Sequence, residues 1–185
     1  MTGFDQKQPG YRGELNNQCV TIAESLKPAS YSTYLSDKWH VCTNTKDEKG
    51  DLHNWPLQRG FDKFFGILNS SASYFDPEIL VSDNKFVKPG EGFYLTDAIS
   101  DTAARYISQH VAKKKKDPFF MYVAYNAPHW PIHAKEKDIQ KYIDRYNMGW
   151  DKLRQARYEK QKKLGLLASN VPLSPRDATV EAWAT

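Results

Sequence analysis

The amino-acid sequence predicts an α/β fold with a mostly parallel sheet, and three observations favour this class. A helical pattern and a strand pattern follow each other directly at residues 21–28 and 31–36. A second helical pattern, at residues 95–111, leads into a continuous apolar run at residues 119–125. Helix and strand patterns that alternate along a chain are typical of α/β proteins. The chain has 185 residues, 40% of them hydrophobic, which is enough for one packed domain.

The first helix is predicted from its N-terminal cap. Thr21 stands three residues before Glu24, the arrangement in which each side chain binds the backbone N–H of the other. Pro28 should end this helix, because proline cannot continue it. We expect three side chains on its inner face: Ile22, Ala23 and Leu26. Residues 31–36, YSTYLS, then alternate Tyr, Thr and Leu with Ser, which indicates a strand.

Residues 47–92 contain many Gly, Pro, Asn and Asp residues, so we expect a long and mostly irregular excursion there. A helix should follow, with Thr96 as its cap and an inner face that contains Leu95, Ala98, Ile99, Ala103, Tyr106, Ile107 and Val111. Lys113–Lys116 lie in its last turn, where positive charge is favourable; an anion-binding patch is the alternative. The run FFMYVAY, residues 119–125, has the composition of a strand buried on both faces of a parallel sheet.

The C-terminal part of the chain is more highly charged and has helical patterns. Residues 134–146 predict a helix with an apolar stripe that consists of Ile139, Tyr142, Ile143 and Tyr146. A weaker helical pattern covers residues 149–167. Residues 169–185 have the Pro and Ser content of a loop.

Composition and charge exclude several classes of protein. The net charge of +4 permits anionic partners and gives no reason to expect nucleic acid. No apolar run approaches the ~18 residues that a membrane-spanning helix needs, and residues 1–13 do not have the pattern of a signal peptide. Two cysteines, Cys19 and Cys42, make neither a disulfide framework nor a Cys-x-x-Cys metal pair. Whether they pair with each other stays open.

Unusual polar sequences follow two of the predicted strands. SDKWH, residues 36–40, ends the first strand, and NAPHWP, residues 126–131, follows the apolar run. Ligands in open α/β sheets bind beyond the carboxyl ends of the strands, so Lys38, His40 and His129 could meet in one crevice. An ammonium group and two imidazoles are suited to binding an oxyanion, and the imidazoles could transfer protons near neutral pH. The alternative is a pair of ordinary surface turns.

Four stretches resemble the sulfatase family, in the family's order along the chain. TIAESLKPASYSTYLSDKWHVC (residues 21–42) is similar to T-I-A-E-x-L-K-x-A-G-Y-x-T-x-x-x-G-K-W-H-L-G, and WPLQRGFDKFFG (55–66) to R-G-F-D-x-F-x-G. DPFFMYVAYNAPHWPIHA (117–134) is similar to P-F-F-x-Y-x-A-x-x-x-P-H-x-P. LSPRD and the later AW (173–183) are similar to a stretch of bacterial arylsulfatase-like members. The resemblance covers nearly the whole chain.

This resemblance implies a partial alkaline-phosphatase-like three-layer sandwich, with residues 1–185 as the central part of a single sulfatase catalytic domain that is incomplete at both ends. Family members hydrolyse sulfate esters with a formylglycine, made from a Cys or a Ser, and usually bind calcium. We expect both groups in a full-length member and no cofactor within this chain. The resemblance implies that Lys38 holds a sulfate oxygen, that His40 hydrogen-bonds the formylglycine, and that His129 contacts the leaving group.

The resemblance also indicates partners and location. Lys38, His129 and, as a further candidate, His133 would bind the substrate, which would be a sulfated small molecule or glycan. A full-length member would work in the periplasm or outside the cell. The sequence does not identify the sulfate ester or the oligomeric state.

The sequence departs from the family pattern at several positions. Neither Cys19 nor Cys42 lies in the C-x-P-S-R nucleophile motif, and the Asp pair that binds the metal is absent. We therefore predict that this chain has no metal site of its own and is inactive in isolation. Ser30, Asp37 and Cys42 replace family glycines, and Asp37 places a negative charge beside Lys38. The alternative function is thus a degenerate, non-catalytic protein that binds sulfated glycans or a partner. Hydrolysis of phosphate or phosphonate esters on the same fold is a third hypothesis.

Overall fold

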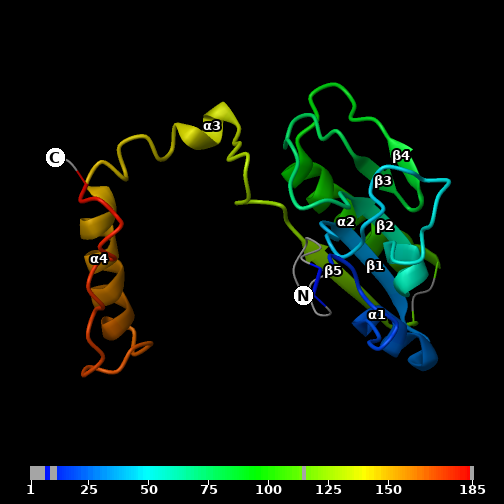
Figure 1. The fold of residues 1–185 in the computed structure, drawn as a ribbon, viewed down its shortest axis with the longest axis horizontal. Helices are drawn as coiled ribbons and strands as arrows, with labels where there is room; N and C mark the ends of the chain where they lie inside the picture. Colours follow the sequence, from blue (N-terminus) through cyan, green and yellow to red (C-terminus); the bar gives the residue numbers. More distant parts are fainter. Residues whose placement is uncertain (1–6, 9–11, 114–115, 184–185) are drawn as a thin grey trace. The chain divides into compact units, whose positions relative to one another are not determined.

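The structure is a computed structural model that describes residues 7–8, 12–113 and 116–183 (Figure 1). The chain forms two compact units. We call Met1–His133 the sheet unit and Ala134–Thr185 the helical unit. The sheet unit contains the helices α1 (Ile22–Leu26) and α2 (Leu95–Lys113), and the strands β1 (Ser32–Asp37), β2 (Lys63–Gly66), β3 (Leu80–Ser82), β4 (Lys85–Val87) and β5 (Phe119–Ala124).

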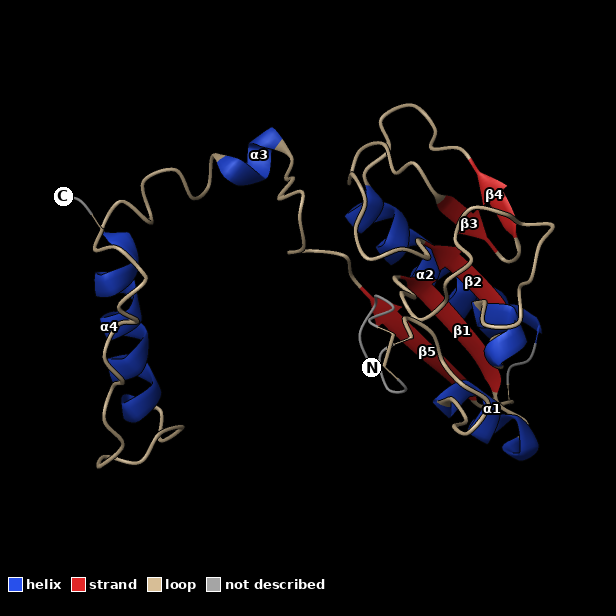
Figure 2. Cartoon of the chain, viewed as in Figure 1, coloured by secondary structure: helices blue, strands red, loops and turns tan. Residues whose placement is uncertain are grey.

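The five strands form one mixed sheet in the order β4-β3-β2-β1-β5 (Figure 2). β1 lies between β2 and β5 and is parallel to both, with Leu35 opposite Phe64 on one side and Tyr122 on the other. β3 and β4 form an antiparallel hairpin that extends the sheet beyond β2. The three parallel strands β2, β1 and β5 therefore all present their carboxyl ends at one edge of the sheet, as the predicted α/β class requires.

Two apolar clusters cover the two faces of the sheet. Successive side chains of a strand point to opposite faces, so Phe64 and Phe65 belong to different clusters. The first cluster lies under α1 and the segment 42–61, and its members include Ala23, Leu35, Trp55, Phe64 and Val81. The second lies under α2, and its members include Ile67, Tyr74, Leu80, Leu95 and Ile99. Residues 32–36 are buried throughout because both faces are covered, although the YSTYLS pattern predicts alternation.

The predicted capping box at the start of α1 is confirmed. The Glu24 backbone N–H donates to the Thr21 hydroxyl at 3.0 Å, and the Thr21 N–H donates to the Glu24 carboxylate at 2.6 Å. Gly60 packs against this turn with φ +91°, and a Cβ there would lie 2.5 Å from the Glu24 backbone nitrogen. The expectation that Ile22 faces inward is wrong, since its side chain is 65% exposed. The five-residue helix buries Ala23 instead.

The prediction of an irregular excursion over residues 47–92 is wrong in part. This stretch contains a 3₁₀ helix at Pro56–Arg59 and the strands β2, β3 and β4. Each of these strands has only three or four residues, and a strand so short shows hardly any alternation in sequence. Pairing with β1 and with one another stabilises them, and this is information that a local pattern does not contain.

The helix predicted at residues 95–111 is α2, with three differences. Thr96 is not its cap, because the helix begins one residue earlier, at Leu95. Ile107 and Val111 are 37% and 52% exposed, so the buried face includes Thr102 and His110 instead. Lys113 lies in the last turn as predicted, whereas residues 114–115 of the lysine run lie outside the described part of the chain.

β5 forms where the apolar run predicts a strand, but it is not buried on both faces. Its side chains are half-buried or exposed, with Phe119 37% and Tyr122 47% exposed. Within the described residues β5 pairs only with β1 and is an edge strand of the sheet. A continuous apolar composition is typical of a strand covered on both faces, and the described residues do not cover β5 in this way.

The helical unit contains α3 (Glu136–Ile139) and α4 (Gly149–Lys163). The helix predicted over residues 134–146 is reduced to the four residues of α3, and its apolar stripe is exposed. The weaker pattern at residues 149–167 forms the longer helix. No helix in the described ranges is long and apolar enough to cross a membrane.

Candidate functional site

The segment Lys38–His40 leaves β1 and connects the ends of all three parallel strands. Its three backbone N–H groups donate to residues at the ends of the neighbouring strands: Lys38 to Ala124 at 3.1 Å, Trp39 to Ile67 at 3.0 Å, and His40 to Leu68 at 3.1 Å. Lys38 is therefore fixed beside the end of β5, and His40 beside the segment that leaves β2. These hydrogen bonds beyond the strand ends fix the backbone position of both residues.

Trp39 fixes the segment in the core. Its indole Nε1–H donates to the carbonyl oxygen of Asn54 at 2.6 Å, and its ring meets Phe61 edge to face at 5.9 Å. Lys38 and His40 are half-buried on either side of this anchor. His40 has φ +51°, the left-handed region that non-glycine residues seldom adopt. Such an outlier next to a strand end is a typical feature of functional sites.

His129 lies in the turn that follows β5 and is exposed. Its backbone N–H donates to Asn126 at 2.9 Å, and Nδ1 lies 2.9 Å from the carbonyl oxygen of Trp130. A carbonyl oxygen only accepts hydrogen bonds, so Nδ1 carries a proton. In the neutral ring Nε2 is then an acceptor, and it becomes a donor when the ring is protonated.

His133 is held against the loop before β3 by Tyr74, a residue that is 2% exposed. The Tyr74 backbone N–H donates to Nδ1 of His133 at 3.3 Å, and the Tyr74 hydroxyl donates to the carbonyl oxygen of His129 at 2.8 Å. Phe75 lies 5.7 Å from the His133 ring. Because Nδ1 accepts, neutral His133 carries its proton on Nε2. Tyr74 thus positions both predicted histidines of this segment.

The structure brings the backbones of the predicted site residues to one edge of the sheet. Lys38 and His40 follow β1, and His129 follows β5, its parallel neighbour. That their side chains line one pocket stays a prediction, and so does the substrate-binding role of His133. Asp37 belongs to β1, but its side chain lies outside what the structure describes.

Two residues near this edge were missed by sequence reasoning. Tyr74 has the positioning role given above, and only the adjacent Phe75 distinguishes it in the local sequence. Asn69 follows Leu68, the residue bonded to His40, and its buried Oδ1 has no hydrogen-bond partner in the described part of the chain. Buried acceptors are nearly always satisfied, yet no local motif marks this asparagine.

The described residues contain no group of three or more His, Cys, Asp or Glu side chains that could hold a metal ion. Both cysteines are free thiols, Cys19 exposed and Cys42 buried. Burial raises the pKa of the Cys42 thiol to about 12, and the nearby Glu14 adds to this effect. Cys42 is therefore a packing residue and not an activated nucleophile.

The chain matches known sulfatases over nearly its full length. The family model for sulfatases matches residues 1–180. An uncharacterized sulfatase of Schizosaccharomyces pombe is 32% identical over 193 residues, which cover 95% of this chain and 33% of that protein. An arylsulfatase of Klebsiella aerogenes is 28% identical over 173 residues, or 89% of this chain and 36% of that protein. The chain thus spans about a third of the length of these relatives.

Solved structures show the same fold. Ps i-CgsB is 31% identical with a TM-score of 0.56, over 65% of this chain and 29% of that one. The same protein has been solved in complex with k-i-k-neocarrahexaose. A protein in complex with its substrate D-glucosamine-2-N,6-O-disulfate has a TM-score of 0.53 and 24% identity, over 71% of this chain and 23% of that one. These neighbours are sulfatases of alkaline-phosphatase-like fold, and the predicted fold class is confirmed.

Proposed function

The chain belongs to the sulfatase family, and from this premise we propose that the protein containing it hydrolyses sulfate esters, either aryl or carbohydrate sulfates. The observation that carries the proposal is the placement of Lys38, His40 and His129 after neighbouring parallel strands. Those strand ends are where ligands of open α/β sheets bind. The oligosaccharide k-i-k-neocarrahexaose, bound in the Ps i-CgsB complex, supports a carbohydrate as the substrate.

Each of these residues has a proposed role in binding or proton transfer. The Lys38 ammonium group contacts a sulfate oxygen, where a fixed positive charge stabilises the anion as it develops. The backbone N–H of His40 is bonded to Leu68 and holds this residue in a left-handed conformation, and its imidazole would hydrogen-bond the formylglycine in the protein that contains this segment. His129 donates from Nε2 to the leaving oxygen when its ring is protonated, because Nδ1–H is already used by Trp130. His133 would offer Nε2–H to the rest of the substrate.

The sequence contains neither the nucleophile motif nor the metal-binding Asp pair of the family. A formylglycine hydrate supplies the attacking oxygen in family members, but neither cysteine lies in its motif and Cys42 is buried. No step is therefore assigned to either group. We propose that a polypeptide of residues 1–185 alone does not turn over. The protein that contains this segment is proposed to act outside the cytoplasm, in the periplasm or after secretion.

A second function is favoured by the replaced glycines. Ser30 adopts φ +62°, the left-handed region in which the family glycine is unstrained, and Asp37 adds a negative charge next to Lys38. A copy of the sulfatase fold that tolerates both could bind sulfated glycans without hydrolysing them. Cys42 is different, since it does not have a positive φ and packs in the core.

Hydrolysis of a chromogenic aryl sulfate tests the proposal. The protein encoded by the complete gene should hydrolyse the ester, and Lys38→Ala should lower kcat/KM by roughly 10²–10³, the cost of removing one such donor. Lys49→Ala, in an exposed loop, is the matched control and should have no effect. Residues 1–185 alone should show no turnover. Binding of sulfated glycans without hydrolysis by the complete protein would instead favour the degenerate binder.

A further inference from the structure

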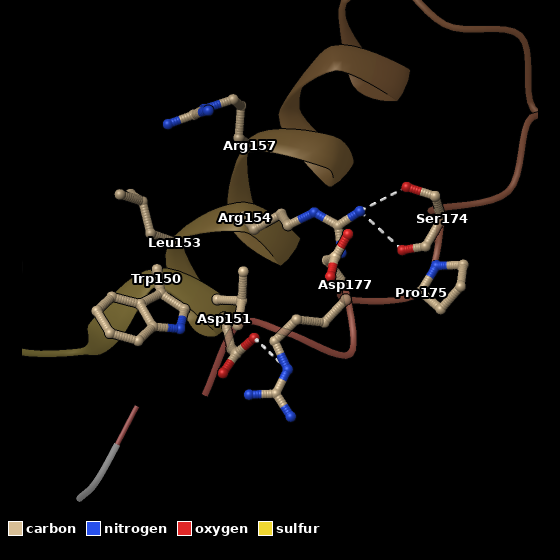
Figure 3. A pocket seen from close by; sticks show the side chains of 10 residues that line it. Trp150, Asp151, Leu153, Arg154, Arg157, Ser174, Pro175 and Asp177 are labelled. Carbon is tan, nitrogen blue, oxygen red and sulfur yellow. Dashed lines mark hydrogen bonds and ion pairs between the residues drawn. The ribbon is translucent and has the colours of Figure 1, made fainter. Parts of the chain in front are cut away.

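A groove of about 790 Å³ lies within the helical unit, between α4 and the segment that follows it (Figure 3). Three of its lining residues are arginines, Arg154, Arg157 and Arg176. The others are Trp150, Asp151, Leu153, Ser174, Pro175, Asp177 and Val180. None of these residues belongs to the candidate site of the sheet unit, so the groove is a separate feature of the chain.

One face of α4 builds the groove by holding the returning chain. Three side chains at helical spacing of four donate to backbone carbonyls of that chain: Trp150 to Glu181 at 3.2 Å, Arg154 to Ser174 at 2.7 Å, and Tyr158 to Val171 at 2.6 Å. Trp183 closes the end of the unit over Gly149, where a Cβ would lie 2.2 Å from the indole. The groove is therefore a built feature of the helical unit.

The three arginines of the groove differ in the hydrogen bonds and ion pairs that they form. Arg154 points toward Ser174, and its Nη2 donates to both the carbonyl and the hydroxyl of that residue (Figure 3). Arg176 faces Asp151 at 3.8 Å, a loose pair, and its side chain is 39% exposed. Arg157 forms no hydrogen bond or ion pair with any described residue and points away from Ser174 (Figure 3). Two guanidinium groups thus remain largely available to a ligand.

The two aspartates of the groove already have partners, so they compete little with an anionic ligand for the arginines. Asp177 accepts from the backbone N–H and the hydroxyl of Thr179 at 2.8 and 2.6 Å, and these bonds lower its pKa. Asp151 faces Arg176 and accepts from the Trp183 N–H at 3.4 Å. With three arginines and two aspartates, the lining has a net positive charge.

The charge of the whole chain is concentrated in this unit. Residues 134–185 contain eleven Lys and Arg against seven Asp and Glu, whereas residues 1–133 contain fifteen of each. The net charge of +4 therefore belongs entirely to the helical unit. Such a concentration attracts polyanions and raises their local concentration.

We propose that this groove binds a sulfate group of a sulfated polysaccharide. The substrate class rests on the proposed function. The planar guanidinium group matches the oxygens of a sulfate through two parallel hydrogen bonds, and Arg157 and Arg176 have donors available for them. Trp150, 46% exposed at the groove, adds a flat apolar surface for a sugar ring.

Calorimetry with a heparin octasaccharide at physiological salt tests the inference on the intact chain. The double variant Arg157→Gln/Arg176→Gln should weaken binding by about tenfold or more, because two charge-assisted contacts are lost. The matched control Lys160→Gln/Lys163→Gln removes the same charge from exposed positions of α4 outside the groove, and it should weaken binding by less than about threefold. Circular dichroism checks that both variants keep their helix content.

Three outcomes would overturn the inference. Equal weakening by the two double variants would mean that the octasaccharide is held by diffuse charge. Equal affinity for the desulfated octasaccharide or for single-stranded DNA of the same charge would remove the sulfate specificity. Loss of binding in Lys38→Ala, with no effect of the arginine variant, would place the ligand at the candidate site, so the inference would fail while the proposed function stood.

Discussion

The backbone N–H of His40 donates to the carbonyl oxygen of Leu68 at 3.1 Å, just beyond the last paired residues of β1 and β2. This bond joins the segments that leave the two strands at the carboxyl edge of the sheet. It holds His40 at φ +51° and leaves Asn69, with its buried unsatisfied oxygen, as the next residue on the partner segment. The backbone of the segment Lys38–His40 is thus hydrogen-bonded to the segments that leave the neighbouring strands.

The left-handed conformation of Ser30 predicts a stabilising substitution. A non-glycine residue pays about 1–2 kcal/mol in this region, and glycine loses about 0.5–1 kcal/mol more entropy on folding. Ser30→Gly should therefore raise the free energy of unfolding by roughly 0.5–1 kcal/mol, measured by urea denaturation. Ser25→Gly, inside α1, should lower it by a similar amount. A decrease for Ser30→Gly would contradict the conformation described for this residue.

The two cysteines should differ in reactivity. Cys42 is 6% exposed and its thiol pKa is raised by burial to about 12, whereas Cys19 is exposed. At pH 8 a thiol reagent such as DTNB should label one cysteine rapidly and the second only in guanidinium chloride, because the thiolate is the reactive form. Cys19→Ser should abolish the rapid phase, and Cys42→Ser should keep it. Two rapid phases in the native protein would contradict the burial of Cys42.

The carboxylate of Glu24 should make stability depend on pH. Burial by itself would raise its pKa, but hydrogen bonds from the Thr21 backbone N–H and from Arg59 outweigh burial and lower it. Its contribution is therefore present above the unfolded pKa of about 4.3 and is lost as the pH falls through the lower folded value. The difference in free energy of unfolding between the wild type and Glu24→Gln should shrink from pH 7 to pH 3.

Glu91→Gln, on an exposed loop, is the control for this measurement and should match the wild type at every pH. A constant difference between Glu24→Gln and the wild type across the range would show that the ionised carboxylate contributes nothing.

Asp37 decides between the working enzyme and the degenerate binder. A charge at ~4 Å is worth about 4 kcal/mol at an effective dielectric of 20, and salt screens it over about 8–10 Å. Asp37→Gly in the protein encoded by the complete gene should therefore raise kcat/KM for an aryl sulfate by at least roughly tenfold, or ~1.4 kcal/mol. Asp37→Asn separates the effect of charge from that of the backbone. Equal rates for all three proteins would make Asp37 a harmless replacement.

The sequence predicted those features that depend on local chemistry. The capping box of Thr21 and Glu24 formed as expected, because it requires only two residues at fixed spacing. β1 and β5 also formed where their composition indicates, and the polar residues after them lie at one edge of the sheet. What the sequence could not provide was pairing: β2, β3 and β4 are too short to be recognised without their partners.

In the helical unit, too, the strength of the sequence pattern did not predict which segment forms the long helix. The apolar stripe at residues 139–146 is regular and yet stays exposed, whereas α4, with a weaker pattern, forms over fifteen residues. Contacts of Trp150, Arg154 and Tyr158 with a segment that reads as loop stabilise α4. For the candidate site, Lys38, His40 and His129 were found by motif, but Tyr74 and Asn69 depend on the folded arrangement of loops distant in sequence.

An NMR titration of the histidine ring and Lys38 resonances with inorganic sulfate, at constant ionic strength, tests most directly whether one sulfate site exists. If Lys38, His40 and His129 form one sulfate site, their signals should shift together with a single dissociation constant, and Lys38→Ala should weaken the response of both histidines. His110, bonded to the Tyr34 hydroxyl and to the carbonyl oxygen of Asp117 just before the start of β5, is the internal control and should not respond. Different dissociation constants for His40 and His129, or no response of His129, would contradict a shared site.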